Sequence, residues 1–314
     1  MPLRSEAAAR AADRGASYCE SAPVGLVVLD TDIGGDPDDF VALVVAARLV
    51  PDLLVVTADE VGGLRAQLAR RVLGLVGRSD VEVIEGIDLG ERRLFLPDPG
   101  QSVPAYVLPS VQEREDRRHE LADALNQRIV NAEGPVQWVG CGPMTNVATL
   151  LRAAPELAEQ ITVTQMGGWL DHCRDPERGE HNLRTDTLAT GWALRILPAP
   201  RLVLADHTNH PEIRVTTDWT LIHALDSDSA PEWARLLSAH FHRWIARGYD
   251  GFWLHDPLTL SAALGYEFVT FAETRVRIGD DARLCRDPYG RLIRASADAD
   301  YAGFVAWLLE QVRW

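Results

Sequence analysis

An acidic segment that directly follows an apolar run constrains the fold more than any other part of the chain. Residues 24–29 (VGLVVL) lead into residues 30–39 (DTDIGGDPDD), where five of ten residues are aspartates. Dense apolar residues before a glycine pair are typical of a buried parallel strand that ends in a turn, and residues 40–49 then have a helical pattern. The aspartates are therefore expected at the carboxyl edge of a sheet, where open α/β sheets bind ligands.

The aspartates also need a neutralising partner. Closely packed carboxylates repel and raise one another's pKa unless a cation lies between them, and hard oxygen ligands suit Ca²⁺ or Mg²⁺. The alternative is a solvated acidic turn in which Asp39 caps a helix. A cap needs only one aspartate and not five, so we favour the cation site.

Composition sets limits on the partners. The chain has 314 residues, of which 25% are charged and 46% hydrophobic, and its formal net charge is −15. This charge argues against general affinity for nucleic acid or an anionic membrane. No uninterrupted apolar stretch could span a bilayer, and the N-terminus lacks a hydrophobic signal core. We expect a cytoplasmic protein with a small-molecule substrate.

The four cysteines suggest neither a disulfide framework nor a zinc site. They are widely spaced and form no Cys-x-x-Cys pair, at Cys19, Cys141, Cys173 and Cys285. Reduced thiols, which fit a cytoplasmic location, are the expected state.

Alternating strand and helix patterns predict one α/β domain with an open, mostly parallel, doubly wound sheet over residues 24–314. Residues 1–23 are interpreted as a tail, and residues 88–112 as a long loop. Further strands are expected at 52–58, 81–84, 136–139, 161–166 and 201–205, and antiparallel strands within 268–296 around a turn at 287–290. Helices are expected at 64–76, 113–131, 186–194, 233–247, 255–264 and 298–312.

Four of the predicted strand-end turns carry groups that could converge on one site. They are Asp32, Asp36, Asp38 and Asp39 in the first, Asp59 and Glu60 in the second, Glu180 and Asn182 in a later one, and His255 and Asp256 in the last. Each has an ordinary alternative: an aspartate before a proline can be a helix cap, and a lone histidine can be a core or surface residue. Beside an acidic cluster, His255 becomes a candidate proton donor.

Five motifs together resemble the inosine-uridine preferring nucleoside hydrolase family. They are DTDIGGDPDDFVAL at 30–43, CGPMTNVA at 141–148, VTQMGG at 163–168, EHN at 180–182 and HDPL at 255–258. Their order and spacing fit from about residue 24 to the C-terminus. The resemblance implies an open α/β fold that binds Ca²⁺ and cleaves the N-glycosidic bond of ribonucleosides, as a homodimer or homotetramer.

The resemblance also implies roles for individual residues. The implied Ca²⁺ ligands are the carboxylates of Asp32, Asp39 and Asp256 and the carbonyl of Cys141, and Asp32 would also be the base that activates the attacking water. The implied substrate contacts are Asp38 and Asn182 with the ribose, Glu180 with the 5′-hydroxyl, Met166 beneath the sugar and His255 facing the leaving base.

Departures from the family pattern bear on the substrate. The acidic motif is two residues longer than the commonest form and adds Asp36, to which we assign no role. Glu60 stands where many members have a ribose-contacting asparagine, and Arg174 where many have an asparagine that binds the 5′-hydroxyl. Arginine pairs with phosphate or carboxylate, so a 5′-modified substrate is conceivable, and neutralising Glu180 is an equally plausible task.

The pocket for the base is less well defined by the sequence. The histidine and glycine-rich stretch that some members carry near residues 85–95 for purines is absent. Trp169, Phe252 and Trp253 flank the motifs, and each could stack on a planar leaving group or be a core aromatic.

Two other functions remain open. A non-catalytic nucleoside-binding protein of the same fold is disfavoured because Asp32 and Asp256 are both present. A haloacid-dehalogenase-like phosphatase would use Asp30 as nucleophile and Asp32 as acid, but it usually needs a downstream lysine, and this chain contains no lysine.

Overall fold

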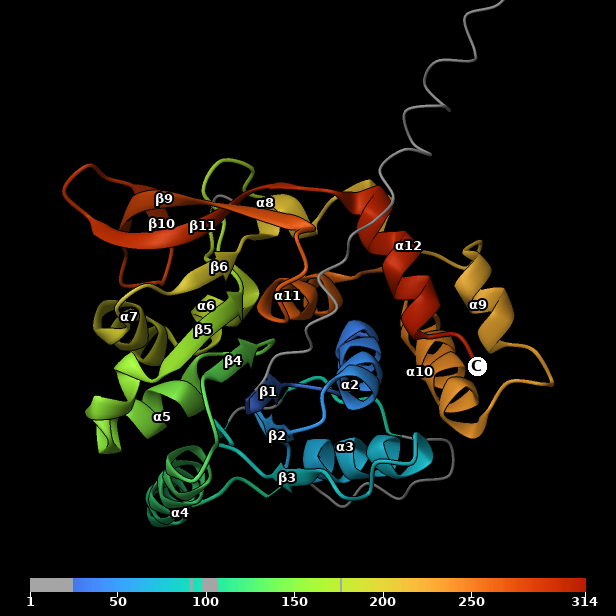
Figure 1. Ribbon diagram of the computed structural model, residues 1–314, viewed down its shortest axis with the longest axis horizontal. Coiled ribbons are helices and arrows are strands. Elements are labelled where there is room, and N and C mark those ends of the chain that lie inside the picture. The colour runs from blue at the N-terminus through green and yellow to red at the C-terminus, as the bar shows by residue number, and fades with distance from the viewer. Residues whose placement is uncertain (1–24, 91–92, 98–106, 176) are drawn as a thin grey trace, which may run out of the picture.

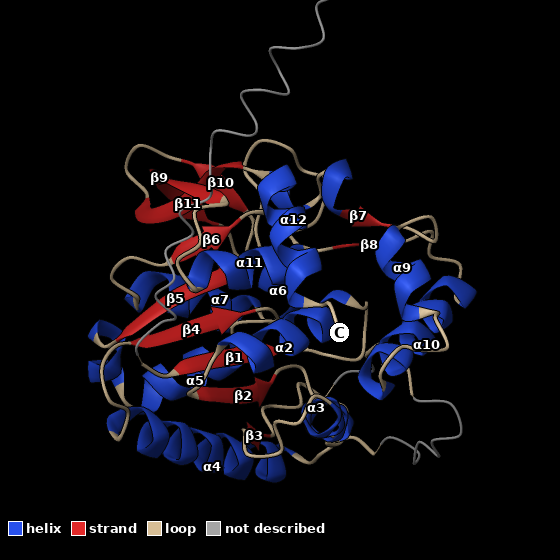
Figure 2. Cartoon of the chain, turned by 45° about the vertical axis from the view of Figure 1, so that its right-hand side comes forward, coloured by secondary structure: helices blue, strands red, loops and turns tan. Residues whose placement is uncertain are grey.

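A nine-stranded sheet forms the centre of the computed structural model, which describes residues 25–90, 93–97, 107–175 and 177–314 (Figure 1). The strands lie in the order β10 (Leu284–Arg286), β9 (Val269–Ile278), β11 (Arg291–Ala299), β6 (Arg201–Val203), β5 (Ile161–Met166), β4 (Val136–Gly140), β1 (Val27–Thr31), β2 (Leu53–Thr57) and β3 (Glu82–Ile84). Figure 2 shows a separate two-stranded ribbon of β7 (Arg214–Val215) and β8 (Phe252–Trp253).

The order of the strands indicates where along the sheet a ligand would bind. All neighbours from β3 to β11 pair in parallel, and only β9 and β10 add antiparallel strands. The chain winds outward from β1 to β3 and then returns to the other side of β1 to continue through β4, β5 and β6. In open α/β sheets the crevice at such a reversal is where ligands bind. The predicted fold class is confirmed, and the acidic segment follows β1 directly at this point.

Helices cover both faces of the sheet (Figure 1). One face packs against α2 (Asp38–Leu49), α3 (Leu64–Leu75), α10 (Glu232–Ala246), α11 (His255–Ala263) and α12 (Tyr301–Gln311). The other packs against α4 (Val111–Val130), α5 (Thr145–Ala153) and α7 (Thr187–Ile196). Within β1, Val27 and Leu29 face the first core and Val28 the second. This two-sided burial explains why the strand is apolar without alternation.

Short elements complete the fold. They are α6 (His181–Thr185), α8 (Ala205–Thr208) and α9 (Thr220–Leu225). None of these was expected, because four to six residues are too few for a periodic pattern. Helix α4 begins two residues before the prediction, since Ser110 and Glu113 form a capping box. The predicted tail at 1–23 and part of the predicted loop at 88–112 lie outside the described residues. Among the helices that the structure describes, none has the length and apolar character needed to cross a membrane.

Candidate active site

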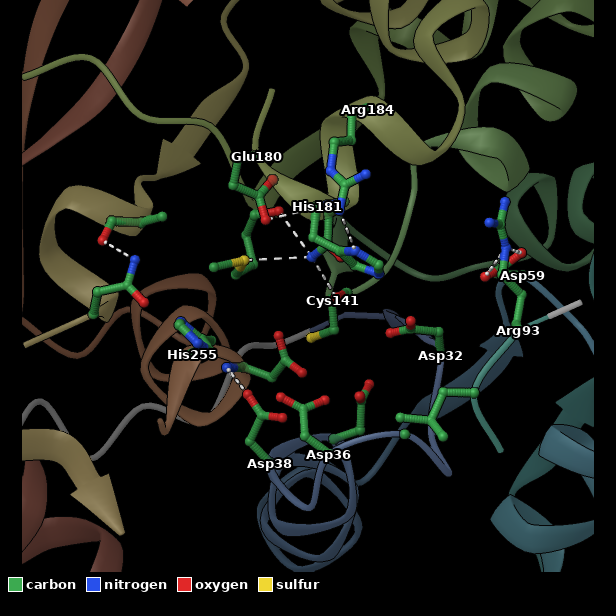
Figure 3. Close-up of a pocket in the computed structure, with 18 of the residues that line it drawn as sticks. Asp32, Asp36, Asp38, Asp59, Arg93, Cys141, Glu180, His181, Arg184 and His255 are labelled. Atoms are coloured by element: carbon green, nitrogen blue, oxygen red, sulfur yellow. Dashed lines mark hydrogen bonds and ion pairs between the residues drawn. The ribbon is translucent and has the colours of Figure 1, made fainter. Parts of the chain in front are cut away.

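A cavity of about 630 Å³ opens at the carboxyl edge of the sheet. It brings together nearly all the residues singled out from the motifs. Those in its lining are Asp32, Asp36, Asp38, Asp39, Asp59, Cys141, Met166, Trp169, Arg174, Glu180, Asn182, His255 and Asp256. Figure 3 labels Asp32, Asp36, Asp38, Asp59, Cys141, Glu180 and His255 among them. They come from the ends of β1, β2, β4 and β5 and from the first turns of α2, α6 and α11. Strand-end turns distant in sequence therefore converge as predicted.

The floor of the cavity is a carboxylate cluster. Asp36, Asp38 and Asp39 each offer an oxygen within 4.8 Å of the others, an arrangement that could hold a metal ion. Asp256 joins them from α11, where its backbone N–H donates to Asp38 Oδ2 at 3.3 Å across 218 residues of sequence. Thr31 Oγ1 donates to Asp39 Oδ1 at 2.5 Å. The cluster thus links the first and last motifs.

Burial makes this cluster costly to leave uncompensated. Asp38, Asp39 and Asp256 are only 1–3% exposed, which raises the pKa of each carboxyl well above its ordinary range, and mutual repulsion raises it further. The pKa of Asp36 is raised for the same reasons. The solvated-turn alternative therefore fails, as does simple capping, because Pro37 and Leu254 occupy the N-caps of α2 and α11.

Asp32 and Cys141 lie where β1 and β4 come closest. A Cβ added at Gly142 would lie 2.9 Å from Ala58 Cβ and 3.3 Å from Asp32 Cβ, so this close approach requires glycine. The carbonyl of Cys141 accepts a hydrogen bond from Asn182 Nδ2 at 2.7 Å. A carbonyl oxygen has two lone pairs, so one remains for a second partner.

Residues that do not belong to the motifs bind the backbone of the acidic loop, residues 30–39. Buried Arg65 of α3 donates from Nη1 to the carbonyls of Asp32 and Ile33, the latter at 2.9 Å, and from Nε to that of Asp59 at 2.9 Å. The Gly34 carbonyl accepts from the Leu96 N–H at 2.8 Å. His240 Nε2 of α10 lies 3.0 Å from the Gly35 carbonyl oxygen. Four consecutive carbonyls thus have hydrogen-bond partners.

Opposite the floor, Glu180 and Asn182 are fixed by backbone contacts. The Glu180 carboxylate caps α6 by accepting from the N–H groups of Asn182 at 3.1 Å and Leu183 at 3.2 Å. It also accepts from Gly168 N–H at 3.1 Å, which ties α6 to the turn after β5. Asn182 Nδ2 lies 3.3 Å from Met166 Sδ as well as near the Cys141 carbonyl. Three predicted substrate contacts therefore form one connected wall.

His255 was predicted to face the leaving base as a proton donor, and its surroundings bear on its charge. The ring lines the cavity, with Nδ1 hydrogen-bonded to Thr208 Oγ1 at 2.6 Å. Burial, aided by the nearby Arg174 charge, lowers the pKa of His255 to about 3. The imidazole is therefore neutral at neutral pH and is not a cationic proton donor.

The substrate contact predicted for Glu60 is not supported by the geometry. Its carboxylate accepts from Thr57 Oγ1 at 2.5 Å and from the N–H groups of Val61 at 3.0 Å and Ala66 at 2.9 Å. The Glu60 carboxylate therefore binds backbone N–H groups before and within the first turn of α3, and Glu60 does not line the cavity. Its neighbour Asp59, in a left-handed conformation with φ 49°, faces the cavity and pairs with Arg93 at 2.8 Å. Arg93 was not anticipated.

Only one of the three predicted stacking aromatics, Trp169, lines the cavity. Phe252 is 2% exposed and packs against Phe241 in the core. Trp253 also lies outside the lining. The lining aromatics that the motifs missed are Trp244 and Tyr249, whose rings stack 3.7 Å apart. Trp244 lies in the last turn of α10 and Tyr249 in the loop that follows the helix, and neither belongs to a motif.

The position of Asp30 bears on the phosphatase alternative. Asp30 is 1% exposed and accepts from Asn146 Nδ2 at 2.8 Å, and burial raises its pKa to about 8. It does not line the cavity. A nucleophile must reach its substrate, so the attacking role that a dehalogenase-like phosphatase needs is incompatible with this geometry.

Comparisons with known proteins identify the family of the chain. The family model "Inosine-uridine preferring nucleoside hydrolase" matches residues 27–300. A pyrimidine-specific ribonucleoside hydrolase RihA of Shewanella woodyi is 27% identical, and the match covers 91% of this chain and 97% of that protein. The enzyme of the same name from Photobacterium profundum is 28% identical, and the match covers 81% of this chain and 83% of that protein.

Solved structures show the same fold. A plant nucleoside hydrolase, the PpNRh1 enzyme, superposes with a TM-score of 0.69 at 21% identity and covers 92% of this chain and 99% of its own. An inosine-uridine preferring nucleoside hydrolase from Bacillus anthracis superposes with a TM-score of 0.67 at 17% identity, and the match covers 91% of this chain and 99% of that protein. The chain therefore belongs to the inosine-uridine preferring nucleoside hydrolase family and is an N-ribohydrolase.

Proposed function

We propose that the chain is a Ca²⁺-dependent hydrolase that converts a ribonucleoside or related N-riboside and water into free base and ribose. The observation that carries the proposal is the buried Asp38 Oδ1, which has no hydrogen-bond partner among the described residues although it lies in a cluster of carboxylates. Such an oxygen is costly unless a ligand satisfies it.

The donor set fits Ca²⁺. Carboxylates and a backbone carbonyl are hard oxygen ligands, and Ca²⁺ accepts six to eight of them in irregular geometry. The residues that would hold the ion are Asp32, Asp39 and Asp256 through carboxylates and Cys141 through its carbonyl. Asp36 lies close enough to add to the negative charge of the site, and the unpaired Oδ1 of Asp38 would accept a hydrogen bond from a ribose hydroxyl. When bound, the ion would orient a sugar diol and favour ionisation of a water molecule.

The chemistry assigned to the chain's own residues follows from their positions. Cleavage passes through an oxocarbenium-like state with positive charge on the sugar, which the carboxylate floor stabilises. Asp32, on the rim of the floor, accepts the proton of the attacking water. Water adds to the anomeric carbon as the bond to the base breaks, and the base leaves with the electron pair of that bond and takes up a proton from solvent.

The opposite wall would position the sugar and the base. Asn182 and Glu180 would contact ribose hydroxyls, with Met166 beneath the ring. Trp169 and the Trp244–Tyr249 pair would offer aromatic faces to the base. The neutral His255 would contribute a hydrogen bond to the base and not a formal charge.

A panel assay tests the proposal. Purine and pyrimidine ribonucleosides and their 5′-nucleotides are incubated with the purified protein and Ca²⁺, and new reducing sugar is measured. We expect sugar release that is abolished by chelation and restored by Ca²⁺. Tight Ca²⁺ binding without product from any substrate would favour the alternative, a non-catalytic nucleoside-binding protein.

A homodimer or homotetramer and a cytoplasmic location also remain predictions. The described cysteines, Cys141, Cys173 and Cys285, are free thiols, as expected for a reducing compartment. Sedimentation of the purified protein and fractionation of the source cells would test the two predictions separately.

A further inference from the structure

The two sides of the cavity differ in charge, since carboxylates form the floor whereas arginines accompany Asp175 and Glu180 on the opposite side. Figure 3 shows Asp32, Asp36 and Asp38 on one side and Glu180, His181 and Arg184 on the other. The lining on the second side also includes Arg174 and Arg178, from the segment between β5 and α6. Three arginines thus fall within eleven residues of a chain whose net charge is −15.

Two of these arginines have no carboxylate partner among the described residues. Arg174 donates from Nη1 to Asn209 Oδ1 at 3.1 Å, and its guanidinium lies 4.7 Å from the Trp253 ring centre. Arg184 has only His181 Nδ1 within reach of Nη2, at 3.5 Å. Arg178, by contrast, lies 3.7 Å from Asp175.

The Trp253 ring offers an internal comparison. Arg214 lies on the same indole at 5.0 Å, and it is paired with Asp250. Arg174 has the ring and a neutral amide but no acid, although it is the guanidinium that lines the cavity. Stacking holds a planar guanidinium in place while its remaining N–H donors stay available for a bidentate anion.

Glu180 does not serve as the missing acid. Its two carboxylate oxygens accept three backbone N–H groups, and no ion pair joins it to Arg174 within the described part of the chain. The alternative in which Arg174 neutralises Glu180 therefore lacks support. The two guanidiniums line the same cavity as Glu180 and Asn182.

We propose that the substrate is an anionic N-riboside whose sugar end carries an oxyanion group, phosphate or carboxylate, that Arg174 and Arg184 bind. This inference rests on the proposed N-riboside hydrolysis and narrows its substrate class. The carboxylate floor binds the diol end of the substrate through a cation. Arg174 and Arg184, which we call the arginine wall, bind the oxyanion at the other end, so one molecule contacts both sides of the cavity.

Matched substrate pairs test the inference. kcat/KM is measured for a nucleoside, its 5′-monophosphate and its 5′-carboxylate, each with the same base. We expect an anionic member to exceed the neutral nucleoside by roughly tenfold or more, since a charge-assisted bidentate contact is worth about that factor. The phosphate and carboxylate arms decide which oxyanion is the natural one.

Variants separate the arginine wall from general electrostatics. R174Q and R184Q should each lower the ratio of anionic to neutral kcat/KM by roughly tenfold, and R174K should recover only part of it because lysine cannot bind bidentately. The matched control is R118Q on α4, where Arg118 is paired with Glu115 outside the cavity; it should leave the ratio unchanged.

Product inhibition tests whether the protein binds the anionic group itself. Ribose 5-phosphate should inhibit the wild-type protein more strongly than ribose, and R174Q should remove the difference. Cleavage of neutral nucleosides with no anionic preference, or a ratio that R174Q and R184Q leave unchanged, would overturn the inference while leaving the proposed function intact. If no riboside is cleaved, the proposed function fails, and equal binding of ribose 5-phosphate and ribose by calorimetry would then overturn the anion site as well.

Discussion

At the level of single residues, Asp32 and Asp36 differ from the other carboxylates of the floor in their exposure. Asp38, Asp39 and Asp256 are buried, whereas Asp32 is half-buried at the end of β1. A proton acceptor must meet water, while a carboxylate that only balances the charge of an ion need not. Exposure therefore leaves Asp32 and Asp36 as the carboxylates of the floor that can meet water, and Asp32 is the one that we assign as the base.

We expect Asp32→Asn to lower kcat by about 10²–10⁴-fold, because asparagine keeps the shape and an oxygen ligand but cannot take up the proton. Initial rates with the best substrate of the panel would measure the loss, and circular dichroism would verify the fold. Asp171→Asn, outside the cavity and paired with Arg286 at the surface, is the control and should retain full activity. A rate for Asp32→Asn close to that of the wild type would disprove the assignment.

The sequence did not reveal the residues that bind the backbone of the site and do not themselves face the cation or the substrate. Asp32, Asp38 and Asp256 belong to compact motifs at predicted strand ends, so their convergence followed from parallel-sheet topology. Arg65 and His240 belong to helices outside the motifs, and nothing local marks them.

Glu60 was misassigned because adjacent residues of a turn can point in opposite directions. The left-handed conformation at Asp59 turns its carboxylate into the cavity and that of Glu60 back toward α3. Non-glycine residues rarely adopt this conformation, so the sequence contains no sign of it.

At the level of elements, the acidic loop depends on helix α3. Arg65 binds the carbonyls of Asp32, Ile33 and Asp59 and thereby joins the turns after β1 and β2. Its charge also lowers the pKa of Asp39, although burial and acidic neighbours outweigh it. The helix therefore influences both the shape and the electrostatics of the floor.

Arg65→Met should weaken Ca²⁺ binding by about tenfold or more, because three carbonyls lose their donor and the ligands move apart. Calorimetric titration with Ca²⁺ measures this without reference to activity. Arg78→Met is the matched control, since Arg78 likewise binds backbone carbonyls, those of Val50 and Pro51, away from the cavity. Equal Ca²⁺ affinity in the two variants would show that Arg65 is only structural.

For the molecule as a whole, the reversal of strand order between β1 and β4 determines where the site forms. The long strand and helix patterns were enough to predict the doubly wound sheet, and nearly every long element lies within a few residues of its predicted range. The aromatic lining at and after the end of α10 was not predictable, because its position depends on how α10 packs against neighbouring helices and not on any local pattern.

Burying the carboxylate floor makes stability depend on pH and Ca²⁺ together. The pKa values of Asp38, Asp39 and Asp256 are raised on folding, so the folded state holds more protons than the unfolded state above about pH 4. Their stabilising contribution is complete below that pH and is lost as the pH rises through the folded values. Without Ca²⁺, the free energy of unfolding should therefore fall from pH 5 toward pH 8. Asp30, whose pKa is raised to about 8, adds to the same slope.

Ca²⁺ should reverse most of this loss, because the cation replaces the protons that the floor gives up. Its stabilising effect should therefore grow between pH 5 and pH 8, as expected for a ligand that binds the deprotonated folded state alone. Denaturant unfolding at several pH values, with chelator or with saturating Ca²⁺, measures the difference, and Mg²⁺ should stabilise less because it demands regular octahedral geometry. A gain from Ca²⁺ that is equal at pH 5 and pH 8 would mean that the ion does not displace protons from these carboxylates, and the floor would then not be its binding site.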